Sequence, residues 1–349
     1  MATSLSPFLH AVRAVWPPLV LAVVLTAIVP LVLATGDGIL ARTVTDALIR
    51  MVMVIGLYIF IGNSGVLSFG HIGFTLIGAY ATVWLTLPPL KKSLVLQLPA
   101  FLAERQFPFL PSAVAAGTLA SLVALIVGVP IMRLGGIAAS IATLAVLGML
   151  YTFYTNWPAW TMGAATLPGI PLYVNMWVAL AWVVFALAVA YAFQVSRLGL
   201  ALRASREDEF AARAVGISIW SQRLAAFVLS AFFMGIGGVL QAHFLGSIAV
   251  KNFWLSLTFV SIAMLIVGGQ RSLTGAVVGT AVVSVIAELL RQLETGVDLG
   301  FAVVQVPLGA RELGIAVVML LILILRPSGI TGGREIPWPF NRQATAASR

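Results

Sequence analysis

The chain has 349 residues, of which 61% are hydrophobic and only 9% are charged, and its mean hydropathy is +1.07. Soluble domains carry roughly 25% charged residues, so this composition excludes a water-soluble fold and indicates a membrane protein. The formal net charge is +9. The basic residues lie at the ends of apolar runs instead of forming one stripe, which argues against nucleic-acid binding and favours charges that face the cytoplasm and anionic lipid.

Apolar runs long enough to cross a bilayer follow one another along the chain, since one span needs about 20 apolar residues. The uninterrupted runs are Trp16–Thr35, Ser112–Met132, Gly136–Thr155, Val174–Gln194, Leu224–Ala242 and Leu313–Leu325. Two further regions consist of shorter runs separated by a break: Met51–Gly62 then Ile72–Leu87, and Leu255–Gly268 then Ala276–Leu290. Counting every piece as one crossing predicts an all-α, polytopic transmembrane helical bundle of about ten spans, with two regions broken.

The basic residues predict the orientation of this bundle. The loop 196–223 carries five arginines, and by the positive-inside rule it faces the cytoplasm. Counting spans outward from it places both termini on the same side. We therefore expect a cytoplasmic N-terminus (residues 1–15), one transmembrane domain (residues 16–326) and a basic cytoplasmic tail (residues 327–349). The basic residues that depart from this rule, because they would lie outside, are Lys91, Lys92 and Arg105.

The two broken regions share a composition, because Gly62–Gly73 and Gly268–Gly279 both place a glycine- and serine-containing break between helices. Backbone polar groups at membrane depth need protein or a water-filled cavity around them, and paired breaks in the two halves of a transporter indicate the substrate path. The polar residues predicted to line or gate such a path are Asn63, Ser64, Ser68, His71, Arg271 and Ser272. The alternative is that the small residues only permit close helix packing.

Within the loop 196–223, the segment Glu207–Gly216 predicts a short helix. Acidic residues at its start suit the positive end of a helix dipole, and Gly216 supplies a stop. Such a helix either lies in solvent or fits as a knob into a groove of a partner.

Several motifs together resemble one family of transporters. Glu209–Gly216 resembles the EAA loop with which permeases of ATP-binding-cassette (ABC) importers contact their ATPase. Gly65–Phe74 and Leu202–Ile217 together resemble the branched-chain amino-acid permeases. The segments that resemble the M-type member of that permease pair are Met132–Ile137, Ile141–Leu144 and Arg206–Glu209. The resemblance extends from about Gly56 to Gly329.

This resemblance implies a permease domain of the ABC-importer type in the inner membrane of a bacterium, with a homologous second permease, two ABC ATPase subunits and a periplasmic solute-binding protein as partners. The residues to which it assigns ATPase coupling are Arg203, Glu207, Glu209, Ala211, Ala212 and Gly216. The solute is expected to be a branched-chain or other amino acid. Thr161–Gly169 departs from the glycine pattern usual in the family, so urea and short amides stay open as solutes.

ATP chemistry is not expected in this chain. A phosphate-binding loop needs Gly-Lys followed by Ser or Thr, and none of the three lysines, Lys91, Lys92 and Lys251, follows a glycine. Cysteine is absent, which excludes a thiol nucleophile and a thiolate metal site. We expect no catalytic residue, cofactor site or metal site here, with ATP bound by the partner subunits.

Two other functional classes remain as alternatives. An ion-coupled secondary transporter or channel usually has acidic residues within the membrane; Glu288 is the internal candidate, but Arg291 follows at the i+3 spacing of a surface ion pair. A rhomboid-like intramembrane serine protease could use Ser64, in Gly62-Asn-Ser-Gly65, together with His243. A nucleophilic serine needs a neighbouring base, and these two residues lie far apart in the sequence.

Overall fold

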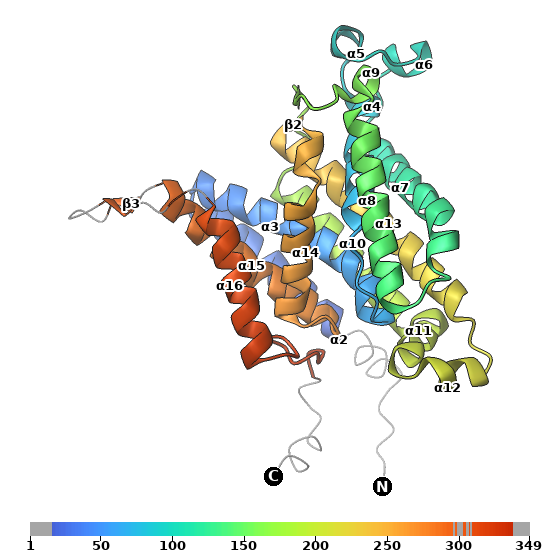
Figure 1. Cartoon of the computed structure of the whole chain (residues 1–349). Helices are drawn as coiled ribbons and strands as arrows, with labels where there is room; N and C mark the ends of the chain where they lie inside the picture. The colour runs from blue at the N-terminus through green and yellow to red at the C-terminus, as the bar shows by residue number, and fades with distance from the viewer. Residues whose placement is uncertain (1–15, 296, 299–302, 305–306, 308, 338–349) are drawn as a thin grey trace, which may run out of the picture.

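The computed structural model describes residues 16–295, 297–298, 303–304, 307 and 309–337, and these residues form a bundle of long helices (Figure 1). The expected cytoplasmic N-terminus, residues 1–15, and the end of the expected tail, residues 338–349, lie outside the described residues. The long helices are α2 (Trp16–Ala34), α3 (Gly38–Leu57) with the π-helix η1 (Tyr58–Gly62), α4 (His71–Thr86), α7 (Phe109–Ile131), α8 (Gly136–Thr155), α10 (Met176–Val195), α13 (Ile219–Leu245), α14 (Leu255–Gly268), α15 (Leu273–Thr295) and α16 (Ala310–Leu325).

Short elements connect these helices. They are α5 (Pro89–Val95), α6 (Ala100–Ala103), α9 (Pro158–Thr161), α11 (Arg197–Glu207), α12 (Glu209–Ala214) and the 3-10 helix η2 (Val250–Asn252). Two antiparallel strand pairs complete the described chain: β1 (Leu167–Pro168) with β2 (Ser247–Ile248), and β3 (Val297–Asp298) with β4 (Val303–Val304).

The predicted polytopic helical bundle is confirmed. In the described chain, eight helices are long and apolar enough to cross a membrane, and α4 with α5, which meet at 120°, makes up to nine. The apolar part of α16, Leu313–Ile322, is shorter than a full span. The predicted number of about ten therefore requires that α16 also crosses.

Most uninterrupted apolar runs form helices with nearly the predicted bounds, whereas α3, α13 and α15 are longer than predicted. α13 extends over Ile219–Leu245 instead of Leu224–Ala242. α3 begins at Gly38 instead of Met51, and α15 extends from Leu273 to Thr295 instead of from Ala276 to Leu290. Asp37 starts α3 because its side chain accepts hydrogen bonds from the amides of Ile39 and Leu40. The added turns contain charged residues, which interrupt the apolar pattern without interrupting the helix.

α13 lies at the centre of the bundle and packs on α4, α7 and α3. Its buried face is rich in small residues, and Gly235 and Gly238 lie against the backbone of α4. A Cβ atom on Gly238 would overlap the carbonyl oxygen of Thr75, and one on Gly78 would overlap the carbonyl oxygen of Gly235. The two helices therefore approach as closely as small-residue interfaces in membranes permit.

The bundle has two distinct ends (Figure 1). α11 and α12 lie at one end, which we call the loop end. The first turns of α2 lie beside the last turns of α10 there, and the segment after α16 returns to the start of α15. α5, α6 and α9 lie at the opposite end, which we call the far end.

Two lysines at the far end bind backbone carbonyl groups, which accounts for basic residues on the side where few were expected. The Lys92 ammonium is fully buried and donates to the carbonyl oxygens of Leu85 (3.3 Å), Leu102 (2.8 Å) and Arg105 (2.6 Å). The exposed Lys91 donates to the carbonyl oxygen of Gly169 at 3.1 Å. These charges therefore hold a loop together.

Replacing Lys92 by methionine is expected to loosen the loop between Pro88 and Pro111. The change keeps the apolar stem but removes the ammonium donor from the carbonyl oxygens of Leu102 and Arg105, whereas that of Leu85 still accepts from the amide of Phe107 at 3.0 Å. A buried polar group without a partner costs about 1–3 kcal/mol. Hydrogen exchange followed by mass spectrometry should show faster exchange in this loop and unchanged exchange in α13. Lys91→Met is the matched control, since it removes one exposed contact; equal effects of the two changes would contradict the prediction.

Candidate functional site

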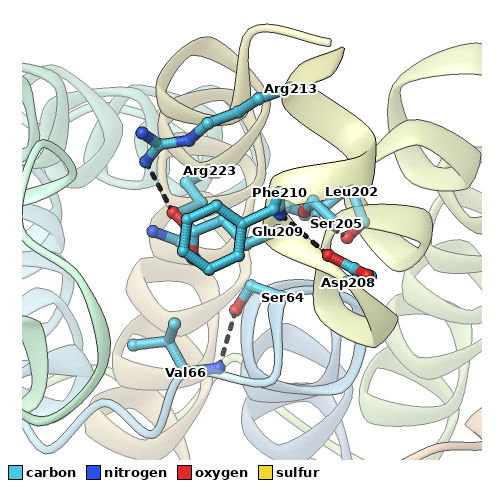
Figure 2. Close-up of polar contacts among 9 residues, drawn as sticks. All are labelled: Ser64, Val66, Leu202, Ser205, Asp208, Glu209, Phe210, Arg213 and Arg223. Atoms are coloured by element: carbon cyan, nitrogen blue, oxygen red, sulfur yellow. Dashed lines mark hydrogen bonds and ion pairs between the residues drawn. The ribbon is translucent and has the colours of Figure 1, made fainter. Parts of the chain in front are cut away.

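The loop between α10 and α13 folds as two helices instead of one short helix. The sequence predicted a helix over Glu207–Gly216, but Glu207 is the last residue of α11, and α12 begins at Glu209. Asp208 separates them, because its extended backbone breaks α11 and its Oδ1 accepts hydrogen bonds from the amides of Phe210 and Ala211, both at 2.9 Å (Figure 2). Asp208 is thus the N-cap of α12.

Gly216 ends α12, as predicted. Its φ of +82° lies in the left-handed region, which a residue without Cβ adopts at low cost. The amide of Ile217 donates to the carbonyl of Ala212, and the amide of Gly216 donates to that of Arg213. This is the Schellman pattern of a helix C-terminus, and it fixes where the chain turns toward α13.

Glu209 joins the two helices that flank this turn. Its carboxylate pairs with Arg213 of α12 at 2.7 Å and with Arg223 of α13 at 3.2 Å, and Figure 2 shows it between them. Burial raises the pKa of Glu209, but the hydrogen bonds and charges of the two arginines outweigh burial and lower that pKa. The ionised carboxylate therefore stabilises the folded loop fully above its ordinary pKa of 4.5, and this contribution is lost as the pH falls through the lowered value.

The other residues with a predicted coupling role lie along the same loop. Arg203 donates to the carbonyl oxygen of Gln194 at 3.1 Å and so ties α11 to the end of α10. Glu207 is exposed and accepts a hydrogen bond from Arg206, which lowers its pKa. Ala212 is buried, whereas Ala211 faces outward. The structure thus brings all six residues into one loop, and their role in coupling stays a prediction.

Arg206 makes a contact that the sequence did not indicate. Its guanidinium group donates to the carbonyl oxygen of Gly62, 144 positions earlier in the chain. Gly65, whose φ is +72°, lies against the same side chain, so that a Cβ atom at position 65 would overlap the Arg206 stem. α11 is therefore in direct contact with the first break.

The first break holds four of the predicted path residues in buried positions. Asn63 donates to the carbonyl oxygens of Ile59 (3.0 Å) and Tyr58 (3.4 Å). The Ser64 hydroxyl accepts from the amide of Val66 at 3.2 Å (Figure 2). The hydroxyl of Ser68 lies 2.6 Å from Nδ1 of His71. All four side chains are at most 3% exposed.

His71 lies within an aromatic cluster rather than beside other ionisable groups. Its ring centre is 5.1–5.9 Å from the ring centres of Phe60, Phe74 and Phe227. The first break is therefore stabilised by local hydrogen bonds and by the packing of three phenylalanine rings around His71.

The second break is covered by the segment that follows α16. The amides of Ile330 and Thr331 donate to the carbonyl oxygens of Val267 (2.9 Å) and Gly268 (3.1 Å), and the hydroxyls of Ser272 and Thr331 lie 3.1 Å apart. Part of the predicted basic tail is thus docked onto the bundle. Arg271 is exposed beside Gly333.

Glu335 caps α15 from this segment, which the sequence did not indicate. Its carboxylate accepts hydrogen bonds from the amides of Leu273 (2.7 Å) and Thr274 (3.1 Å), where unpaired amides and the helix dipole favour a negative charge. It also accepts from Gln194 of α10 at 3.2 Å. Glu335 therefore connects α10 with the second break.

The two breaks meet, and the second also packs closely. A Cβ atom on Gly62 would lie 2.7 Å from the carbonyl oxygen of Gln270, so the breaks are neighbours in space. A Cβ atom on Gly268 would overlap the carbonyl of Gly275, and one on Gly279 that of Met264. Close helix packing is thus one role of these glycines; that the six polar residues line a path stays a prediction.

The geometry does not assemble the serine and histidine considered for a protease. Ser64 lies in the first break, whereas His243 lies at the end of α13 near the far end and contacts the hydroxyls of Thr82 (3.1 Å) and Thr86 (3.3 Å). Within the described residues, no group of three or more His, Asp or Glu side chains could hold a metal ion. Glu288 forms the predicted ion pair with Arg291, at 2.6 Å.

The chain is similar to known permeases over most of its length. The family model described as "Branched-chain amino acid transport system / permease component" matches residues 39–325. The high-affinity branched-chain amino acid transport system permease protein LivM of Escherichia coli K12 is 26% identical over 320 residues, which cover 82% of this chain and 68% of LivM.

Two relatives from Methanocaldococcus jannaschii match over shorter stretches. A probable branched-chain amino acid transport permease protein LivH is 30% identical over 139 residues, 39% of this chain and 41% of the relative. A probable LivM is 27% identical over 165 residues, 46% and 48% of the two chains. No solved structure matches the chain. Since the family model covers the bundle from α3 to α16, this chain belongs to the family of branched-chain amino acid transport permeases.

Proposed function

We propose that this permease is the M-type translocation subunit of an ABC importer in the bacterial inner membrane, and that it moves branched-chain or other amino acids delivered by a periplasmic binding protein. A homologous second permease would complete the path, and two ATPase subunits would bind and hydrolyse ATP, so that this chain needs no cofactor. Urea and short amides are the other solute classes to be tested.

The exposed apolar side chains of Phe210 on α12 and of Val215 directly after it are the observation that carries this proposal. Phe210 is 86% exposed and Val215 is 76% exposed, although the helix between them is fixed by the Asp208 cap and by Glu209. Large apolar side chains held outward on a short rigid element favour contact with a partner protein. A groove of an ATPase subunit is the partner that the resemblance of this loop suggests.

The contacts of this loop suggest how ATP-driven closure would reach the spans. Movement of α12 would act on α13 through Glu209 and Arg223, and movement of α11 would act on the first break through Arg206. The path between the two permeases would then open alternately to either side. The residues proposed to line or gate its inner part are Asn63, Ser64, Ser68, His71, Arg271 and Ser272. In this arrangement the loop end, both termini and the tail are cytoplasmic.

The test is to express the chain with its neighbouring genes, purify the complex and measure uptake of amino acids, urea and amides into proteoliposomes. Uptake that requires ATP, an associated ATPase and a binding protein is the expected result, and the panel then identifies the solute. Uptake by the purified chain alone, driven by an ion gradient, would replace this proposal with an ion-coupled secondary transporter.

Replacing Glu209 by glutamine is expected to reduce ATP-dependent uptake at least tenfold while the affinity of the binding protein for solute stays unchanged. The change removes the charge that joins Arg213 and Arg223 but preserves side-chain size. Partly exposed ion pairs contribute only about 0.2–1 kcal/mol each, so the bundle itself should remain folded. Glu104→Gln, which neutralises an exposed acid at the far end, is the control. Normal uptake by the Glu209 variant would exclude this role.

A further inference from the structure

A cavity with charged and apolar residues in its lining opens between α3, α13, α14 and α15 near the far end of the bundle, away from the loop and the first break. Met264 in its lining lies one turn before the second break. Its volume is about 600 Å³, within the range of roughly 300–1,000 Å³ typical of small-molecule sites. The charged residues that line it are Arg42, Asp46, Arg50, Glu288 and Arg291. None of the six predicted path residues lines it.

The charges of this cavity come from two helices that are otherwise apolar enough to span a membrane. On α3 they recur at every fourth residue, and on α15 Ser284, Glu288 and Arg291 follow the same helical spacing, so each set lies on one face of its helix. Arg50 is 12 residues into the span that begins at Gly38, or about 18 Å along the axis.

Charged side chains at such depth rarely face lipid and mark water-filled paths or protein contacts. The cavity is therefore bounded by water or by another subunit.

The ion pairs described within the cavity leave one guanidinium group without a carboxylate partner in the described part of the chain. Arg50 pairs with Asp46 at 2.6 Å, and Arg291 pairs with Glu288 at 2.6 Å. Arg42 is exposed, and its guanidinium carbon lies 5.8 Å from the centre of the Phe244 ring. Among the described residues, no carboxylate pairs with Arg42. Three guanidinium groups thus share the cavity with two carboxylates.

Most of the other lining residues are apolar, and Thr43 and Ser284 are the neutral polar ones. Ile39, Phe244, Leu245 and Met264 contribute to the same wall. The cavity therefore combines a cation without a carboxylate partner among the described residues, carboxylates within ion pairs and a hydrophobic surface. A zwitterion with an aliphatic side chain matches all three features, whereas a neutral amide or urea would leave the Arg42 charge unmatched.

We propose that this cavity is the outer entry site of the solute path, and that Arg42 binds the carboxylate of an aliphatic amino acid while the carboxylates of Asp46 and Glu288 receive its ammonium group. This inference rests on the proposed function as an importer. It places solute recognition in the permease on α3 and α15, at the end opposite to the proposed ATPase contact.

The first test measures leucine uptake by the assembled complex in proteoliposomes. Arg42→Gln is expected to lower ATP-dependent uptake of binding-protein-delivered leucine at least tenfold, with basal ATPase activity and copurification of the second permease unchanged. The control is Arg133→Gln, because Arg133 lies in a similar cation–π contact, 5.7 Å from the ring centre of Trp220, outside the cavity. Wild-type uptake by the Arg42 variant, or loss of the second permease from its complex, would overturn the inference.

The second test uses the absence of cysteine from the sequence. Thr43→Cys places a single thiol in the cavity lining, and Thr118→Cys places one on the exposed apolar face of α7 as a control. A charged, membrane-impermeant thiol reagent added from the outside of vesicles should modify only the first. No labelling of Thr43→Cys would overturn the inference.

These outcomes separate the inference from the proposed function. If the wild-type complex shows no ATP-dependent uptake, the proposed function fails. If it transports urea or amides but not leucine, the importer stands and the zwitterion site is wrong.

Discussion

Replacing Gly238 by alanine is expected to disrupt the α4–α13 interface and to lower the melting temperature of the purified protein. The added methyl group would overlap the carbonyl oxygen of Thr75 and lie 2.9 Å from the amide nitrogen of Ala79. Backbone atoms cannot rotate away as a side chain can, so the helices must separate. Overpacking typically costs about 1–3 kcal/mol, and here a value at the upper end of that range is expected.

The control for this change is Gly148→Ala in α8. Both glycines lie within helices, so both substitutions gain about 1 kcal/mol of helix propensity, but nothing lies within 4 Å of a Cβ atom at Gly148. Size-exclusion chromatography after heating should therefore show loss of the folded peak at lower temperature for Gly238→Ala alone. If both variants melt at the wild-type temperature, the close contact between α4 and α13 is wrong.

Helices with a uniformly apolar sequence could be predicted almost to the residue. α8 and α14 have the bounds that the apolar runs Gly136–Thr155 and Leu255–Gly268 gave. Hydropathy is sufficient there because about 20 apolar residues have few stable alternatives to a membrane helix. The two breaks could be located as well, because glycine and serine interrupt an otherwise apolar run there.

α3 and α15 show where hydropathy fails. Arg42, Asp46 and Arg50 ended the apolar run on the N-terminal side of Met51, although the helix continues through them to Gly38. Hydropathy gives a charge the same value whether it faces solvent beyond a helix end or a polar cavity between helices. α3 and α15 are also the two helices that supply the charged residues of the cavity near the far end.

The predicted coupling residues were found in one loop because they are local in sequence, whereas the partners of that loop are not. Arg206 contacts Gly62 across 144 positions, and Glu335 caps α15 from 61 positions away. A single sequence holds no signal for such pairs. The sequence shows that Arg206 is charged. Its acceptor, however, is a backbone carbonyl oxygen, and every residue type has one.

Replacing Arg206 by alanine is expected to reduce ATP-dependent uptake by the reconstituted complex at least tenfold while ATPase activity and protein yield are retained. The substitution removes the donor to the Gly62 carbonyl and the stem against which Gly65 packs. A lost hydrogen bond from a charged donor costs about 1.5–3 kcal/mol, which a bundle of this size should tolerate. The loop and the first break would then move independently, so that ATP is hydrolysed without transport.

Arg197→Ala is the control for this prediction, because Arg197 is exposed at the start of α11 and its loss changes the charge of the same loop by the same amount. A similar fall in uptake for both variants would mean that the loop acts only through its positive charge. Unchanged uptake for Arg206→Ala, together with a fall for Glu209→Gln, would mean that movement of the loop reaches the membrane spans through α13 alone. A fall for Arg206→Ala with normal uptake for Arg197→Ala makes the contact of Arg206 with Gly62 a mechanical link between the loop and the broken helix.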